Sequence, residues 1–404
     1  MRTYGEIIKM QAALYSKNST KNIKVTTVSR PTLISTTYDP TSISITRFWI
    51  FRIINFVYTC IGHFMCLLRW MVPRMPGPYG EVVGRQWVLC RVYCSGLNPV
   101  DAKFLYGDKL PHFCLPLVKW FVEGRICGID FSGVVIEAPP GCGYTVGDAV
   151  FGTIPPFCGS FAEYVRAPTD FINHKPNNMS FAEACAVPLV GLTVLQAFED
   201  NNLMPGQHVL VLGASGGTGH FAVQIAKIKG ARVTAVASSR NADFVKNLGA
   251  DDIVFYDLSV DILKDLHAIR SIYGPFDLVF DSVSSHDPRD TNFAYETRIR
   301  NAQPKLVTGM YIFIGGVVTD WALAHIKRFF GIDWFPKGRQ LFWVRFQDSA
   351  RRLELLRQFC EANQLKVTIA NRVPFTEEGI QEAFRLQMSR RIVGKIVIEI
   401  LSEK

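Results

Sequence analysis

Residues 209–227, VLVLGASGGTGHFAVQIAK, carry the strongest fold signal in this chain of 404 residues. An apolar run ends in a cluster of small residues, and apolar residues then recur at helical spacing, which predicts a strand, a tight turn and a helix. Such a turn leaves backbone N–H groups at the positive end of the helix, where a pyrophosphate is stabilised. The stretch therefore predicts a dinucleotide site. Its cofactor-binding residues would be those of the turn: Gly213, Ser215, Gly216, Gly217, Thr218 and Gly219.

Strands and helices keep alternating after this turn. Strands are predicted at residues 208–212, 232–237, 252–255, 276–281 and 311–314, an order typical of a doubly wound parallel sheet. Before residue 180, short strands and frequent Gly and Pro turns instead predict a small barrel or sandwich. Residues 10–31 match two of these strands, and Ser180 with Glu183 has capping-box spacing at the start of a helix. The predicted fold class is α/β with a β-rich second domain.

The residues after the second strand of the sheet indicate which dinucleotide binds. An NAD site places an acidic residue on the ribose hydroxyls, about 20 residues beyond the glycines. Here Ser238, Ser239 and Arg240 occupy that place. Two hydroxyls and a guanidinium suit a 2′-phosphate, which an acid would repel. We therefore predict NADPH rather than NADH, and the alternative is a solvated loop after the strand.

Composition restricts the partners and the compartment. The net charge is +9 without any run of five basic residues, so a nucleic-acid-binding arm is not expected. The ten cysteines are scattered without a CxxC pair, which favours free thiols in a reducing compartment over disulfides or structural zinc. The N-terminus lacks the apolar core of a signal peptide, whereas residues 15–47 are rich in Ser and Thr, as transit peptides are. A cytoplasmic location is predicted, and import into an organelle stays open.

Several further blocks match one known family in order. They are GLNPVDAK (96–103), GIDFSGVV (128–135), VGDAVFG (146–152), GSFAEYV (159–165), AVPLVGLTVLQA (186–197), LGADDIVFYD (248–257), FDLVFDSV (276–283) and GKIVIEI (394–400). Together with the glycine turn, they resemble the zinc-independent quinone oxidoreductase branch of the medium-chain dehydrogenase/reductase superfamily, whose members are built like zinc-type alcohol dehydrogenases. The resemblance implies NADPH-dependent hydride transfer and a homodimer.

The resemblance also implies a domain organisation. A GroES-like β-barrel catalytic domain would cover residues 1–185, with an apolar insertion at 35–78. A Rossmann NADP-binding domain would cover residues 186–335. A C-terminal segment, residues 336–404, would return to the catalytic domain.

The zinc positions of that superfamily are altered in this chain. Asn98 stands where zinc members carry a cysteine ligand, and Ile129 and Asp130 replace a His-Glu pair. Without imidazole or thiolate there, we predict that no metal is bound. The acceptor must then be polarised by hydrogen bonds or by its own conjugation, which suits quinones and α,β-unsaturated carbonyls.

The resemblance implies catalytic roles for Asn98, Asp101 and Lys103 near the nicotinamide. Asn98 would donate to a developing oxyanion, or alternatively cap its own turn. Lys103 would stabilise or protonate an enolate, or alternatively be a solvated lysine.

Three more cofactor contacts are implied by the same resemblance. Thr193 would lie by the nicotinamide, Tyr256 would pack near the adenosine phosphate, and Lys395 would approach the cofactor from the C-terminal segment. For each, a packing or surface position is the alternative.

Three aromatic-rich segments have no counterpart in the resembled family: residues 47–74, 110–124 and 319–343. The uncharged stretch 53–68 has 16 residues, fewer than the ~20 needed to span a bilayer. As a helix, residues 47–74 have a broad apolar face and arginines at both ends, which is typical of a helix at a membrane surface. We predict peripheral membrane contact there, and packing within the protein or against a second copy is the alternative.

Two functions fit the sequence. The first is a zinc-free, NADPH-dependent reductase of a small lipophilic quinone or enone. The second is an NADPH-binding, membrane-associated scaffold or assembly factor with little turnover. NADPH oxidation that requires a quinone or enone would distinguish the first from the second.

Overall fold

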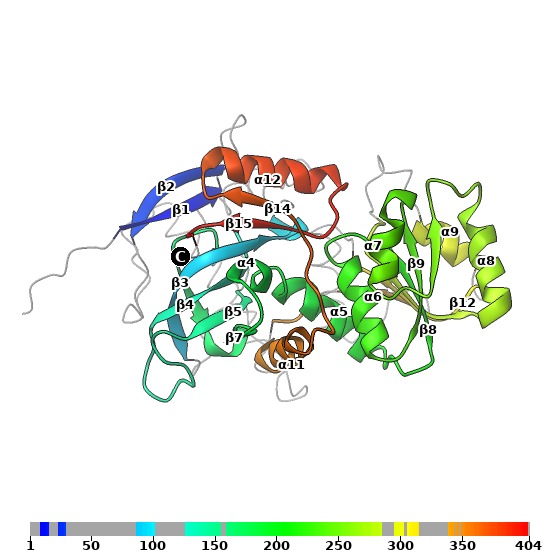
Figure 1. Cartoon of the computed structure of the whole chain (residues 1–404), viewed down its shortest axis with the longest axis horizontal. Coiled ribbons are helices and arrows are strands. Elements are labelled where there is room, and N and C mark those ends of the chain that lie inside the picture. The colour runs from blue at the N-terminus through cyan, green and yellow to red at the C-terminus, as the bar shows by residue number, and fades with distance from the viewer. Residues whose placement is uncertain are drawn as a thin grey trace, which may run out of the picture.

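The computed structural model describes residues 9–15, 23–29, 86–101, 126–154, 159–284, 295–302, 305–314, 338–342, 344–346 and 349–402. These residues form two lobes, one around a sheet of mixed direction and one around a parallel sheet (Figure 1). The predicted α/β class with a β-rich second domain is confirmed. Lys103 and the segments 47–74 and 110–124 lie outside the described residues, as does most of 319–343.

Six parallel strands form one sheet, in the order β10-β9-β8-β11-β12-β13. They are β8 (His208–Leu212), β9 (Arg232–Ala237), β10 (Asp252–Phe255), β11 (Phe276–Asp281), β12 (Val307–Phe313) and β13 (Arg339–Leu341). The first four have the predicted bounds, whereas β12 begins earlier than the predicted strand at 311–314. The strand order reverses between β8 and β11, and such a switch point is where open α/β sheets bind ligands.

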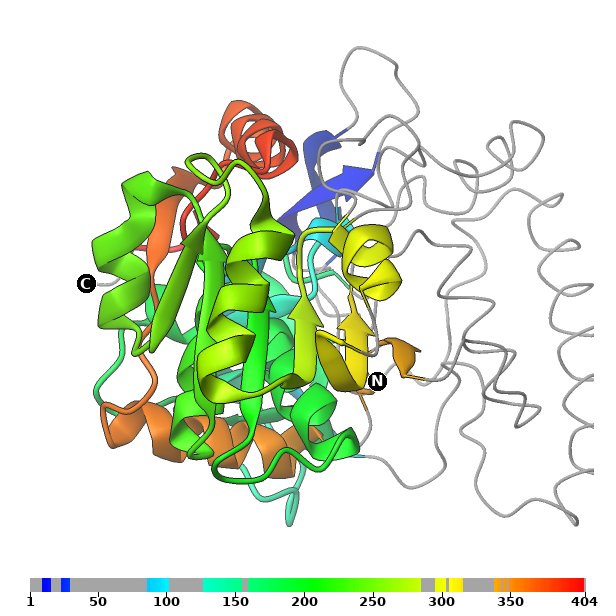
Figure 2. The same ribbon diagram turned by 90° about the vertical axis from the view of Figure 1, so that its right-hand side faces the viewer.

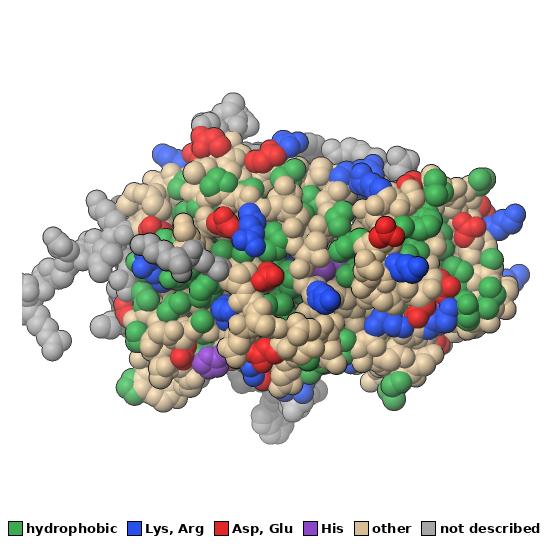
Figure 3. Space-filling model, in the orientation of Figure 1, with side chains coloured by type: hydrophobic (Ala, Val, Ile, Leu, Met, Phe, Trp, Pro, Cys, Tyr) green, Lys and Arg blue, Asp and Glu red, His purple; other side chains and the backbone are tan. Residues whose placement is uncertain are grey.

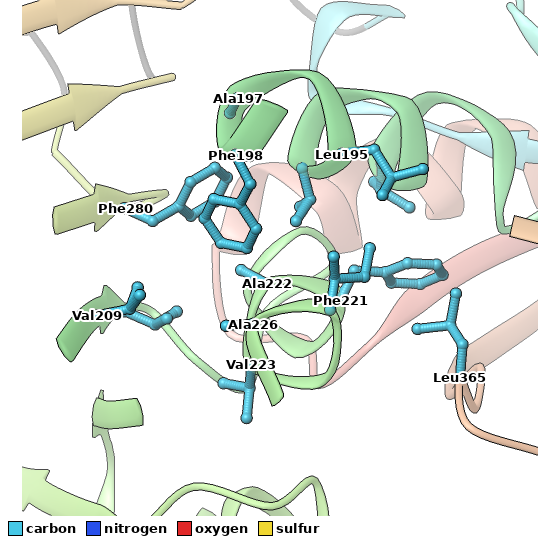
Figure 4. Close-up of a cluster of buried hydrophobic side chains, with 14 of the residues drawn as sticks. Leu195, Ala197, Phe198, Val209, Phe221, Ala222, Val223, Ala226, Phe280 and Leu365 are labelled. Carbon is cyan, nitrogen blue, oxygen red and sulfur yellow. The ribbon is translucent and has the colours of Figure 1, made fainter. Parts of the chain in front are cut away.

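Helices cover both faces of the parallel sheet (Figures 1 and 2). One face holds α5 (Pro188–Asp200), α6 (Gly219–Ile228) and α7 (Ala242–Asn247), and the other holds α8 (Ile262–Tyr273) and α9 (Tyr295–Asn301). In Figure 4, Phe198 of α5 points toward Phe280 of β11, and their ring centroids lie 5.6 Å apart. The sheet is therefore doubly wound, as predicted, and apolar packing fixes α5 and α6 on it.

The second sheet forms the β-rich lobe, and its strands come from both early and late parts of the sequence. It contains β3 (Trp87–Leu97), β4 (Asp130–Glu137), β5 (Ala149–Thr153), β6 (Tyr164–Pro168), β7 (Ile172–His174), β14 (Ile369–Pro374) and β15 (Lys395–Glu399). β15 runs antiparallel to β3, so the last strand of the chain lies beside the first long one. β1 (Lys9–Tyr15) and β2 (Ile23–Ser29) are the two strands predicted within residues 10–31, and they pair antiparallel.

The remaining elements of the described chain are three helices and two short turns. α4 (Phe181–Ala184) begins with the predicted capping box of Ser180 and Glu183. α11 (Ser349–Glu361) packs against α5 and β7, and α12 (Glu377–Ser389) packs against β14 and β15. Two 3₁₀ turns are η2 (Thr169–Phe171) and η3 (Ser239–Asn241). Because β13 pairs with β12, the parallel sheet extends past residue 335, where we predicted the Rossmann domain to end.

The described cysteines are free thiols and buried, in agreement with the prediction: Cys90, Cys94, Cys127, Cys142, Cys185 and Cys360. One helical stretch of the described chain, Phe181–Asp200, is long and apolar enough to cross a membrane, but 78% of its apolar 18-residue window is buried inside the protein. Its burial identifies it as a core segment. On the face shown in Figure 3, side chains of both charges are interspersed among apolar ones.

Candidate active site

The glycine turn between β8 and α6 requires glycine at two positions, Gly213 and Gly219. Gly213 has φ +77°, a left-handed conformation that favours glycine. A Cβ on Gly219 would lie 2.0 Å from the carbonyl oxygen of Gly213. The turn therefore packs directly under the first turn of α6, where helical N–H groups have no intrahelical partner. This geometry fits the pyrophosphate of a dinucleotide.

Lys395 connects this turn to the β-rich lobe. It is the first residue of β15 and is only 2% exposed. A Cβ on Gly217 would lie 3.3 Å from Cδ of Lys395, so the lysine stem lies against the glycine turn. The ammonium donates to the carbonyl oxygen of Leu97 at 2.8 Å and to Oδ1 of Asn98 at 2.6 Å. Residues far apart in the sequence thus meet where the two lobes join.

Asn98 uses its whole side-chain amide within this junction. Oδ1 accepts from Lys395, and Nδ2 donates to the carbonyl oxygen of Gly96 at 3.2 Å and to Oδ2 of Asp130 at 3.0 Å. The backbone N–H of Asn98 donates to Oδ2 of Asp101 at 2.8 Å. This arrangement favours the structural alternative for Asn98, because a developing oxyanion would have to displace one of these acceptors.

Two buried carboxylates, Asp101 and Asp130, interact electrostatically with the lysine. Burial raises the pKa of Asp101 to about 8, and the hydrogen bond from the Asn98 backbone opposes that shift. Burial also raises the pKa of Asp130 to about 6, opposed by the Lys395 charge and by hydrogen bonds from Asn98 and Leu189. Burial lowers the pKa of Lys395, and the two carboxylates counteract it. The junction is an electrostatically coupled unit.

Asp130 also reaches the parallel-sheet lobe. Its carboxylate accepts from the backbone N–H of Leu189 at 3.1 and 3.2 Å, close to the start of α5. Asp130 was predicted only as a replaced zinc position, so this contact between the lobes was not foreseen. The available signal was a carboxylate at the first position of a largely apolar strand.

The adenosine end of the predicted site has an unexpected acid. Ser238 donates its hydroxyl to Oδ2 of Asp257 at 2.7 Å, and Ser239 does the same at 2.9 Å. The backbone N–H of Ser239 donates to Oδ1 of Asp257 at 2.8 Å. Arg240, by contrast, is exposed. Both predicted hydroxyls are thus engaged by a carboxylate that was not foreseen, and their contact with a 2′-phosphate stays a prediction.

The remaining predicted residues occupy defined positions. Thr193 donates its hydroxyl to the carbonyl oxygen of Leu189 within α5. Ser215 accepts from Nδ2 of Asn241 at 3.0 Å, which ties the glycine turn to η3. Thr218 immediately precedes α6, and Tyr256, partly buried, donates its backbone N–H to the carbonyl oxygen of Ala237. The predicted site residues that the structure describes therefore fall in two groups. One group lies at the lobe junction, with Asn98 and Lys395, and the other lies after β9, with Ser238 and Ser239.

Among the described residues, no group of three or more His, Cys, Asp or Glu side chains is placed to hold a metal ion. At the positions that correspond to zinc ligands, Asn98 and Asp130 hydrogen-bond each other, and Ile129 is buried in an apolar cluster. These donors do not form a zinc site.

Comparison with known proteins gives two family matches. The alcohol dehydrogenase GroES-like domain matches residues 84–177, and the zinc-binding dehydrogenase domain matches residues 217–296. Among curated relatives, the human mitochondrial NAD(P)H oxidoreductase RTN4IP1 is 29% identical over 345 residues, which is 78% of this chain and 82% of that protein. The 2-methylene-furan-3-one reductase of Solanum lycopersicum is 29% identical over 77% of this chain and 71% of its own.

A plant relative and a solved structure agree with these matches. The chloroplast envelope quinone oxidoreductase homolog of Arabidopsis thaliana is 34% identical over 42% of this chain and 52% of that protein. The quinone oxidoreductase of Coxiella burnetii shares the fold, with a TM-score of 0.67 and 23% identity over 97% of this chain and 100% of that one. The predicted resemblance to the medium-chain dehydrogenase/reductase superfamily is therefore confirmed, and the relatives include proteins named quinone oxidoreductase, NAD(P)H oxidoreductase and enoyl reductase.

Proposed function

We propose that this chain transfers hydride from NADPH to a quinone or an α,β-unsaturated carbonyl without a metal ion. The relatives support an oxidoreductase that uses a nicotinamide cofactor. The observation that carries the finer proposal is the contact of Lys395 with both Asn98 and the glycine turn. A dinucleotide bound at the glycine turn would lie at the lobe junction. It would lie beside Asn98 and Asp130, which stand at the zinc-ligand positions of related enzymes and hydrogen-bond each other.

In this proposal the junction residues hold the cofactor and the turn after β3, and Lys103, outside the described residues, acts on the substrate. When bound, the dihydronicotinamide supplies the hydride. The N–H groups at the start of α6 hold the pyrophosphate, and Lys395 and Asp130 fix the turn that contains Asn98. Asp101, with its pKa raised to about 8, is protonated at pH 7 and holds the same turn through Oδ2. Lys103 is the proposed group that stabilises the resulting anion and returns a proton to it.

NADPH is the proposed form of the cofactor. Ser238, Ser239 and Arg240 offer two hydroxyls and a cation to a 2′-phosphate. A mycobacterial protein of similar fold, with a TM-score of 0.58 and 20% identity, has been solved in complex with NADPH. In this chain, both hydroxyls must first leave Asp257.

The proposal includes partners and a location. We infer a homodimer, a small lipophilic substrate and peripheral membrane contact through residues 47–74, whose apolar residues and flanking arginines support it. The location is proposed to be cytoplasmic or within an organelle, as some relatives carry a mitochondrial designation.

The experiment that tests this function is a substrate panel. Purified protein is mixed with NADPH or NADH and with quinones, conjugated enones, conjugated enals, saturated ketones and alcohols. The proposal predicts NADPH oxidation that requires a quinone or a conjugated carbonyl. Tight NADPH binding without turnover on the whole panel would contradict it and favour the scaffold function.

A further inference from the structure

We infer that Asp257 is a specificity-determining residue that holds the preference for NADPH over NADH small. The inference rests on the proposed function only in assuming that a nicotinamide dinucleotide binds at the glycine turn. It concerns a residue to which the sequence assigned no role, placed two residues beyond the end of β10, which pairs with β9.

The geometry shows why Asp257 competes with a 2′-phosphate. A serine hydroxyl has one proton to donate. The hydroxyl protons of Ser238 and Ser239 both go to Oδ2 of Asp257, at 2.7 and 2.9 Å. A 2′-phosphate that used these hydroxyls would have to displace the carboxylate. If Asp257 stayed in place, the phosphate would lose both donors and approach a like charge.

The carboxylate is well held in this position. The backbone N–H of Ser239 supplies a third hydrogen bond, at 2.8 Å to Oδ1. The hydrogen bonds from Ser238 and from the Ser239 backbone lower the pKa of Asp257 to about 2, so the group is ionised throughout the physiological range. Arg240 is then the one cation among the three residues predicted to bind the phosphate.

The same carboxylate suits a dinucleotide without the phosphate. Acidic residues near the end of the second strand accept hydrogen bonds from ribose hydroxyls in NAD sites. β9 is that second strand, and Asp257 presents its carboxylate there from the turn that follows the adjacent strand β10. NADH therefore keeps a favourable partner while NADPH meets an opposing charge.

The test compares dissociation constants of NADPH and NADH by fluorescence titration for the wild type and Asp257→Asn. Asparagine can still accept a hydrogen bond through Oδ1, so this variant removes mainly the charge. The matched control is Asp243→Asn, because Asp243 is an exposed acid in the first turn of α7 and its loss changes the net charge equally. A third protein, Asp257→Asn with Ser239→Ala, tests whether the released hydroxyl is used.

For the wild type, we expect a preference for NADPH of about tenfold or less. Asp257→Asn should raise the ratio of the two dissociation constants by tenfold or more, mainly by tightening NADPH, and Ser239→Ala should reverse part of that gain. Asp243→Asn should change the ratio less than twofold. A ratio unchanged by Asp257→Asn, an equal response to Asp243→Asn, or a wild-type preference above a hundredfold would overturn the inference.

Different measurements test the role of Asp257 and the reductase activity. Binding is measured without an electron acceptor, so a shifted ratio in a protein that reduces no acceptor would support the role of Asp257 and contradict the reductase. Failure of both dinucleotides to bind would contradict both.

Discussion

Lys395 and Asn98, which are 297 residues apart in the sequence, are joined by a hydrogen bond of 2.6 Å between Nζ and Oδ1. Both side chains are buried. The bond ties the returning strand β15 to the turn after β3, and the lysine stem lies against Gly217 of the glycine turn. The junction of the lobes is thereby organised by a buried polar network, whose loss has measurable consequences.

Lys395→Met should destabilise the protein. The substitution leaves Asp130 buried without the cation that favours its charged form. We expect the free energy of unfolding at pH 7 to fall by about 3 kcal/mol, measured by urea denaturation. Lys366→Met is the control, because Lys366 is exposed. Equal losses for the two variants would show that the buried network contributes nothing to stability.

Asp101 should make stability decrease as the pH rises. Its pKa is raised from 3.8 to about 8, so the folded state holds a proton that the unfolded state releases above pH 3.8. This stabilisation is complete below that pH and is lost as the pH approaches 8, with a limiting slope of about 1.4 kcal/mol per pH unit. Asp101→Asn should therefore gain stability relative to the wild type between pH 5 and pH 8. A pH-independent difference in urea denaturation would refute the assignment.

Arg240→Ala should weaken NADPH binding and leave NADH binding nearly unchanged. Removing a charged hydrogen bond to a phosphate costs on the order of 1.5–3 kcal/mol. The measurement is the dissociation constant of each dinucleotide, with Arg351→Ala on α11 as an exposed control. Unaltered NADPH affinity would mean that no 2′-phosphate is bound by Arg240.

Residues 47–74 should bind anionic membranes. Each cation near an anionic surface adds about 1 kcal/mol, and arginines lie at both ends of the apolar stretch. We expect sedimentation with anionic liposomes and partial release by high salt. Four substitutions to Ser, at Ile53, Val57, Ile61 and Phe64, should abolish binding while NADPH oxidation persists. A wild type that ignores liposomes, with a variant that unfolds or changes oligomeric state, would instead assign the segment to the core or to a subunit interface.

The fold could be predicted from the sequence because its signals are local. The glycine turn and the strands that follow it show the expected periodicity, and four strand bounds agree with the structure. The early start of β12 was missed because its first residues, Val307 to Met310, include a Thr and a Gly, which weaken the strand pattern.

The site was less predictable because its contacts are not local. Asn98 was predicted as a site residue. The hydrogen bonds of its side-chain amide to Lys395, Gly96 and Asp130, however, depend on strand pairing between distant segments. The pairing of Asp257 with Ser238 depends likewise on β10 lying beside β9. The residue types indicated which side chains could bind a ligand. Only the strand topology showed which of these side chains already hydrogen-bond to other parts of the protein.

The central claim is hydride transfer to a conjugated acceptor without a metal. It is tested most directly with chelator-treated protein of measured metal content, NADPH deuterated at the transferable position, and an α,β-unsaturated ketone. The account predicts less than stoichiometric zinc, undiminished turnover after chelation, and deuterium on the β-carbon of the saturated product. One tightly bound zinc ion per chain, activity lost with the metal, or deuterium on the carbonyl carbon would contradict it.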